Sequence, residues 1–164
     1  MLLGFWLAGA AGGVAAQSPA TEQVVRAAMV FNFLKFAEWP TAAASLRLCV
    51  ASGDRKQVEA LEGLTGKQVG GRAVSVVRFA MCETDCRVLY VDARQRWDEV
   101  LASRRRPSQA LTIGAYPGFA LDGGMIEIVR QQGHVRFDVN LGEVRRAGLR
   151  LDSQLLRLAR QVIE

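Results

Sequence analysis

Histidine is nearly absent from this 164-residue chain, in which His134 is the only one. That scarcity excludes metal sites built from several imidazoles and leaves little room for histidine relay chemistry. Lysine is also scarce, because 18 of the 21 basic residues are arginine. No apolar run reaches the roughly 20 residues that a membrane-spanning helix needs. These absences argue against an imidazole-based enzyme and against a spanning helix.

What is present is the composition of a folded domain. Half of the residues are hydrophobic, 23% are charged and the net charge is +5. A chain of this composition can bury enough apolar surface to offset its ordering entropy, which disfavours disorder. The length is that of one domain, and the sequence contains neither an internal repeat nor a long linker.

The first residues have the pattern of an export signal. Residues 2–10 are apolar, residues 9–16 are small or valine, and the first charged side chain is Glu22. Ala16 ends a small-residue cleavage site. We therefore expect residues 1–16 to be a cleaved signal peptide and residues 17–164 to form a single exported domain. The alternative, an uncleaved anchor, is disfavoured because glycine and alanine make a poor lipid-facing helix.

Strands and helices alternate in the body of the chain. Apolar runs predict strands over residues 46–51, 73–79, 86–91 and 110–114. Three- and four-residue apolar spacing predicts helices over 21–38, 54–61, 94–103 and 141–147, and a last one from residue 152 or 153 through Ile163. Residues 125–130 and 134–140, separated by a short turn, predict a β-hairpin, and the second run alternates polar with apolar residues. The expected fold class is α/β, with a mainly parallel central sheet of about six strands, a C-terminal β-hairpin and helices on both faces.

Three cysteines stand at positions 49, 82 and 86, and export makes a disulfide the default. Two pairings compete: Cys82 with Cys86 closes a tiny loop, and Cys49 with Cys86 closes a long one. Loop entropy is worth roughly 2 kcal/mol for the short loop and roughly 4 kcal/mol for the long one. Because Cys49 and Cys86 also both fall in predicted strands, we expect Cys49–Cys86, with Cys82 left as a free thiol. A zinc site would need a fourth ligand that His134 does not supply alone.

Polar side chains follow the predicted strands where ligands of open α/β sheets bind, outside the carboxyl ends of the strands. They are Ser52, Asp54, Asp92, Arg94 and Tyr116. One interpretation is a small-ligand pocket. The other is that these residues are helix caps and solvated loop side chains.

The first predicted helix carries Phe31 and Phe33 and ends at Trp39, before a proline. These aromatic residues belong either to the core or to a partner-binding face.

The arginine run 104–106 would bind phosphate in a cytoplasmic protein. In an exported protein we interpret it as the solvated end of a helix, and we therefore expect no nucleic-acid partner. The sequence contains no phosphate loop with lysine and no apparent nucleophile–base pair. We therefore expect no catalytic residue, no metal and no cofactor.

Six segments of the chain form a recognisable set of motifs: FNFLKFAEWP (31–40), LRLCVA (46–51), CRVLYV (86–91), LTIGAYPGFALDGGMIEIV (111–129), GHVRFDVNL (133–141) and RRAGLRLDSQLLRLAR (145–160). Together they resemble the YfiR family of periplasmic regulatory proteins. The segment 111–129 is part of the most specific match. Cys49 and Cys86 match the family's strand cysteines, so the resemblance implies the long disulfide. The chain departs from some members in lacking a second cysteine pair near the hairpin, and in having Asp152 where small polar residues are usual.

The resemblance also implies a function. Members are periplasmic, non-catalytic repressors that contact the periplasmic sensor domain of an inner-membrane diguanylate cyclase, which lowers cyclic-di-GMP and biofilm formation. An outer-membrane lipoprotein with a peptidoglycan-binding domain can sequester the repressor, and the family forms homodimers. Two other classes of function stay open from the residues alone: a periplasmic small-ligand-binding module and an unrecognised enzyme.

Overall fold

The computed structural model describes residues 20–82, 85–103 and 107–164. The expected signal peptide at residues 1–16 and the arginine run 104–106 lie outside the described residues. In the described ranges, no helix is both long enough and apolar enough to cross a membrane.

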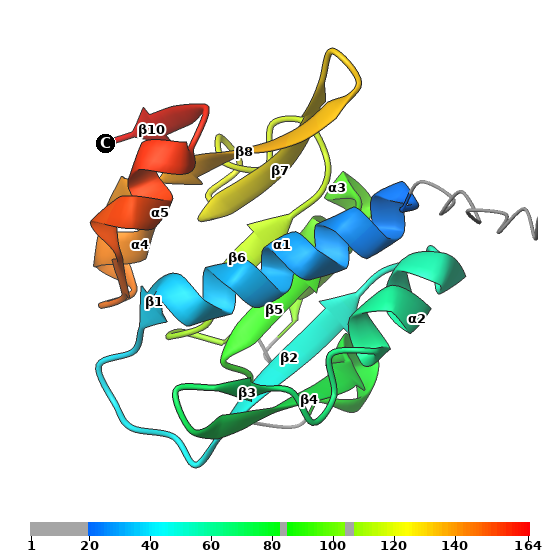
Figure 1. Cartoon of the computed structure of the whole chain (residues 1–164), viewed down its shortest axis with the longest axis vertical. Helices are drawn as coiled ribbons and strands as arrows, with labels where there is room; N and C mark the ends of the chain where they lie inside the picture. Colours follow the sequence, from blue (N-terminus) through cyan, green and yellow to red (C-terminus); the bar gives the residue numbers. More distant parts are fainter. Residues whose placement is uncertain (1–19, 83–84, 104–106) are drawn as a thin grey trace, which may run out of the picture.

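An eight-stranded sheet forms the centre of the described chain (Figure 1). Its strands lie in the order β10-β8-β7-β6-β5-β2-β4-β3. Their bounds are β2 Ser45–Ala51, β3 Gln68–Val69, β4 Arg72–Arg78, β5 Val88–Val91, β6 Leu111–Gly114, β7 Ile126–Gln131, β8 His134–Asn140 and β10 Gln161–Ile163. The helices are α1 Glu22–Phe36, α2 Arg55–Glu62, α3 Arg94–Ala102, α4 Leu141–Arg146 and α5 Ser153–Leu158, with a 3-10 turn, η1, at Phe79–Met81.

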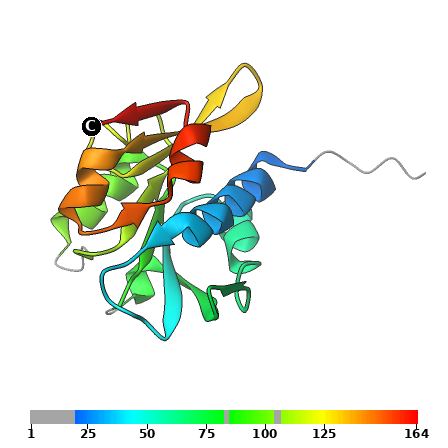
Figure 2. The same cartoon turned by 60° about the vertical axis from the view of Figure 1, so that its left-hand side comes forward.

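The α/β prediction is confirmed, but the sheet is mixed and larger than expected. Parallel pairing joins β10 to β8, β7 to β6, β6 to β5, β5 to β2 and β2 to β4. Antiparallel pairing joins β7 to β8 and β3 to β4. The prediction of about six strands missed the short edge strands β3 and β10, because two or three residues carry no recognisable alternation. The predicted hairpin is β7–β8, which projects from the body with the exposed His134 at its turn (Figure 2).

Helices cover both faces of the sheet. Side chains of α1 and α2 join Leu48 and Val50 of β2 in one buried cluster, while α3 joins Cys49 and Ala51 in a second cluster on the opposite face. Successive strand residues point to opposite faces, so one strand contributes to both clusters. Figure 1 shows α1 and α2 in front of the sheet and α3 behind it. Buried residues of α4 and α5 belong to the first cluster.

Helix caps account for several boundaries. Asp54 accepts hydrogen bonds from the first backbone N–H groups of α2, Asn140 from that of Glu143 in α4, and Asp152 from that of Gln154 in α5. A short oxygen-bearing side chain at this position satisfies N–H groups that have no partner inside the helix. The structure confirms the helix predicted to begin at Asp54, and the cap explains why it begins there.

Two predicted helices end sooner than expected. The first stops at Phe36, and the next two residues form β1 (Ala37–Glu38), which pairs with β9 (Arg150–Leu151) in a separate two-stranded sheet. The last stops at Leu158, and Val162 and Ile163 lie on the strand β10 instead of a helix. The hydrogen bond from Arg160 N to Phe137 O (2.8 Å) begins this pairing with β8. Tertiary pairing therefore overrides the helical spacing of the last residues.

Candidate functional site

The connection between β6 and β7, residues 115–125, is a loop with a buried aromatic residue at its centre. Phe119 is fully buried, and its ring lies between Gly114 and Gly124. A Cβ atom added to either glycine would lie 2.1 Å from a ring atom of Phe119, so no larger residue fits there without movement of the ring. Edge-to-face contacts with Trp97 and Tyr116 complete the packing, with ring centroids 5.0 and 5.4 Å away.

A buried carboxylate on β7 fixes the same loop. Glu127 is only 6% exposed, and its two oxygens accept hydrogen bonds from the backbone N–H groups of Gly118 and Ala120, each at 3.0 Å. A hydrogen bond to a charged acceptor contributes more than one between neutral groups. The carboxylate therefore closes the loop back onto the strand that follows it.

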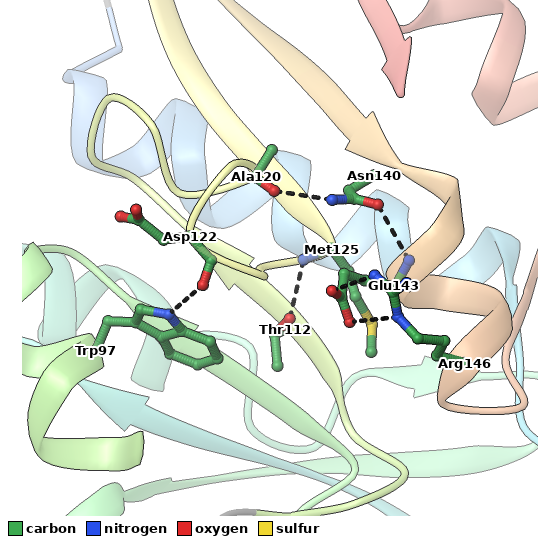
Figure 3. Close-up of polar contacts among 8 residues, drawn as sticks. All are labelled: Trp97, Thr112, Ala120, Asp122, Met125, Asn140, Glu143 and Arg146. Carbon is green, nitrogen blue, oxygen red and sulfur yellow. Dashed lines mark hydrogen bonds and ion pairs between the residues drawn. The ribbon is translucent and has the colours of Figure 1, made fainter. Parts of the chain in front are cut away.

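Three side chains from other elements bind the loop backbone further (Figure 3). Trp97 Nε1 of α3 donates to the carbonyl of Asp122 at 3.1 Å. Asn140 Nδ2, at the end of β8, donates to the carbonyl of Ala120 at 2.8 Å. Thr112 Oγ1 accepts from the backbone N–H of Met125 at 3.0 Å. The loop is thus held from β6, β7, β8 and α3 together.

Arg94 and Tyr116, two residues of the predicted ligand pocket, converge on Asp122. Asp122 Oδ2 accepts from Tyr116 Oη at 3.0 Å and lies 2.8 Å from an Arg94 guanidinium nitrogen. Burial raises the pKa of the Tyr116 phenol well above its ordinary value, and the bond to Asp122 acts in the same direction. Tyr116 therefore stays a protonated donor, which holds the Asp122 carboxylate against the ring.

The other three predicted pocket residues form a separate polar group after β2 and β5. Ser52 Oγ donates to the Asp92 carboxylate and accepts from the Asp54 backbone N–H at 3.1 Å. Asp54 caps α2 and accepts from Gln23 Nε2 of α1 at 3.1 Å, a bond that lowers the pKa of the Asp54 carboxyl. These residues act here as caps and turn residues, so the five predicted pocket residues divide into two groups.

Several hollows mark the surface of the described residues, and two of them concern the site because one adjoins loop 115–125 and the other adjoins Phe31. One, of about 290 Å³, lies beside the loop between Thr112, Gly123 and the exposed ion pair of Glu143 with Arg146. Figure 3 shows this pair near Thr112 and Met125. The second, of about 320 Å³, is an apolar groove between α1 and α2.

The aromatic residues proposed as a partner face have different surroundings. Phe33 is 1% exposed and packs edge-to-face on Phe137, so it belongs to the core, and the prediction that it contacts a partner is wrong. Phe31 is half-buried beside the α1–α2 groove, with Lys35 over its ring. Trp39 is half-buried and donates from Nε1 to the carbonyl of Arg87 at 3.1 Å. Only Phe31 and Trp39 reach the surface.

The disulfide in the structure joins Cys49 to Cys82, with Cα atoms 6.4 Å apart, and leaves Cys86 as a buried thiol. This corrects the expected Cys49–Cys86 bond and the expected free thiol at Cys82. The reason lies in where the strand begins: β5 starts at Val88, two residues after Cys86, and its register sets Leu89 beside Cys49. The turn η1 carries the chain from β4 back to β2, next to Cys49.

Cys86, the third cysteine, lies close to the Cys49–Cys82 disulfide. The three sulfurs lie within 4.8 Å of one another. Burial raises the pKa of the Cys86 thiol to about 12, and its Sγ contacts the carbonyl of Val88 at 3.1 Å. Because the disulfide holds two of the three sulfurs, the oxidised trio does not offer a set of thiolate metal ligands.

Sequence reasoning missed the residues that build the loop. Glu127, Phe119 and Asn140 had no assigned role, although all lie in or beside the segments that carry the family resemblance. Their importance comes from contacts between strands that are not adjacent in sequence. The one available signal was the pair of glycines at 114 and 124, which flank a single phenylalanine.

Comparison with models of known protein families gives a match that includes loop 115–125. A family model described as YfiR/HmsC-like matches residues 23–160, which is well over half of the chain. The matched range includes the sheet from β2 to β8, the loop 115–125 and all three cysteines.

Proposed function

Because the chain belongs to the YfiR/HmsC-like family, we propose that it is a non-catalytic periplasmic regulator. It binds and represses the periplasmic sensor domain of an inner-membrane diguanylate cyclase, and so lowers cyclic-di-GMP and biofilm formation. The observation that carries this proposal is the family match over residues 23–160. No cofactor enters the proposed mechanism, because repression here acts through surface contact.

Two features of the chain besides the family match support the location. Residues 1–16 have the composition of a cleaved signal peptide, which would leave residues 17–164 as one exported domain. A disulfide between Cys49 and Cys82 suits an oxidising compartment. We also propose, from the family, a homodimer and an outer-membrane peptidoglycan-binding lipoprotein that sequesters the repressor.

The physical demands of such a repressor are a stable surface and little rearrangement on binding. Ordering a loop at an interface costs free energy, so a loop that is already fixed binds more tightly than a mobile one. The hydrogen bonds of Glu127, Trp97 and Asn140 to the backbone of loop 115–125 meet this demand.

The decisive experiment is deletion of the gene followed by measurement of cyclic-di-GMP in cell extracts. We expect the level to rise, the full-length gene to restore it, and a gene without codons 2–16 to fail because its product stays in the cytoplasm. An unchanged level in the deletion strain contradicts the proposed function. Restoration by the leaderless gene contradicts the periplasmic location.

A second candidate, a small-ligand-binding module, is favoured by one feature of the topology. The chain leaves β2 toward α2 on one face and leaves β5 toward α3 on the other, although β2 and β5 are adjacent. Ligands of open α/β sheets bind at such a point, and Ser52 and Asp92 lie there. This candidate predicts that a free amino acid or nucleotide raises the melting temperature of the wild type but not of Asp92→Ala. A screen without any such shift rejects it.

A further inference from the structure

The α1–α2 groove, of about 320 Å³, is a hollow that the proposed function does not use. Its walls come from α1 and α2, which lie side by side on one face of the sheet (Figure 1). Small residues leave it open, because Ala28, Ala60 and Gly63 are among those that line it. Along α1 it extends from the exposed Val24 to Phe31, a helical rise of about 10 Å. The groove is therefore apolar, open and long enough for a linear chain.

Two ammonium groups gather at the Phe31 end of this groove. The chain has only three lysines, at positions 35, 56 and 67. The Nζ atom of Lys35 lies 4.6 Å from the centroid of the Phe31 ring, and that of Lys67 lies 5.6 Å from it. Lys35 is on α1 and Lys67 follows α2, so both walls of the groove bring a charge to the same ring.

The charge of these two lysines is not balanced by a carboxylate. In the described ranges, the ion pairs leave out both Lys35 and Lys67. The Lys35 ammonium donates only to the neutral amide oxygen of Asn32, at 3.3 Å. The residues that line the groove include no acidic side chain. An apolar groove with positive charge at one end is complementary to an apolar chain that ends in a negative group.

We propose that the α1–α2 groove binds a free aliphatic carboxylate, a medium-chain fatty acid. The alkyl chain lies along the groove, where each buried CH₂ group contributes roughly 0.8 kcal/mol. The carboxylate is bound by Lys35 and Lys67 beside Phe31. A planar carboxylate has two oxygens, so it can accept from both ammonium groups at once. This site goes beyond the proposed function and does not depend on it.

Titration calorimetry with decanoate, at physiological salt and below its micellar concentration, tests the carboxylate end of the site. We expect the mature protein to bind one decanoate. Lys67→Gln should weaken this binding about threefold, and the double variant Lys35→Gln, Lys67→Gln about tenfold, as expected for two exposed ion pairs. The matched control is Lys56→Gln, because Lys56 is exposed at the start of α2 and does not lie over Phe31. It should bind decanoate as the wild type does.

Decanol and a filled groove test the apolar part. Decanol has the same chain without the charge, so we expect its weaker binding to be the same in the wild type and in the double lysine variant. Ala28→Leu fills the groove from an exposed position on α1 and should abolish binding of both compounds at an unchanged melting temperature. Ala28→Met, with a more flexible side chain, must give the same loss, which guards against a local distortion by leucine.

Four results would overturn the proposal. One is no saturable binding of decanoate to the wild type. Another is equal weakening by Lys67→Gln and Lys56→Gln, which would reflect net charge alone. A third is unchanged binding by folded Ala28→Leu, which would put the ligand elsewhere. The fourth concerns a second copy of the chain as the occupant: if sedimentation shows a wild-type dimer that binds no decanoate and that Ala28→Leu dissociates, the groove is a subunit interface.

Discussion

Replacement of Glu127 by glutamine removes the charge that closes the loop while keeping the size of the side chain. The carboxylate accepts two backbone hydrogen bonds at 3.0 Å, one from Gly118 and one from Ala120. Glutamine has one carbonyl oxygen, so its NH₂ group faces the second N–H and leaves that buried donor unpaired. An unpaired buried donor costs roughly 1–3 kcal/mol, and a bond to a charged acceptor contributes roughly 1.5–3 kcal/mol.

A smaller effect opposes this loss. Glu127 lies opposite Asp138 in the β7–β8 register, so glutamine relieves some repulsion between carboxylates. Arg160 already pairs with Asp138, which makes the relief small. We therefore expect Glu127→Gln to lower the free energy of unfolding by about 3 kcal/mol, and the melting temperature by roughly 6–12 °C.

Urea denaturation and amide hydrogen exchange measure this effect. The matched control is Glu59→Gln, which removes an exposed carboxylate paired with Arg55 and should change stability by less than about 0.5 kcal/mol. In Glu127→Gln, the amides of Gly118 and Ala120 should lose protection. If both variants unfold at the same urea concentration with equally protected amides, the claim that Glu127 fixes the loop is refuted.

Three further predictions concern the core and the cysteines. Phe119→Ala removes a fully buried ring and should cost about 4 kcal/mol in urea unfolding, and a loss under 1 kcal/mol would contradict its packing between the two glycines. Peptide mapping of the unreduced protein should find Cys49 joined to Cys82, and a Cys49–Cys86 peptide would contradict the structure. Replacing both bonded cysteines by serine should lower the free energy of unfolding by about 4 kcal/mol. Burial raises the pKa of the Cys86 thiol to about 12, so iodoacetamide at pH 8 should modify Cys86 only after the protein unfolds. The free energy of unfolding should also fall as the pH rises above the ordinary thiol pKa near 9, because there the thiol ionises only in the unfolded chain. Rapid modification of the native protein would contradict its burial.

The local elements could be predicted from the sequence because their signals are local. Asp54 identifies the start of α2 through its own capping bonds, and the apolar run at residues 46–51 identifies β2. Alternation of apolar and polar residues likewise located β8, although the polar Asp138 is buried in the structure. In each case the information lies within a few residues of the element.

The long-range features could not be predicted in the same way. The cysteine pairing depends on where β5 begins and on how η1 returns to β2, and neither is visible in the spacing of the three cysteines. The residues around Val162 have spacing that suits a helix, but pairing with β8 makes them a strand. The buried role of Glu127 depends on a loop that folds back on its own following strand. An acidic residue in a strand gives no sign of that in the sequence.

The central claim is that this protein acts by binding through a fixed surface. Inactivating cyclase genes one by one in the deletion strain identifies the membrane cyclase whose loss removes the rise in cyclic-di-GMP. Titration calorimetry then measures binding between that enzyme's purified periplasmic domain and the mature protein. We predict saturable binding by the wild-type protein. The absence of any binding by the wild-type protein would contradict the account.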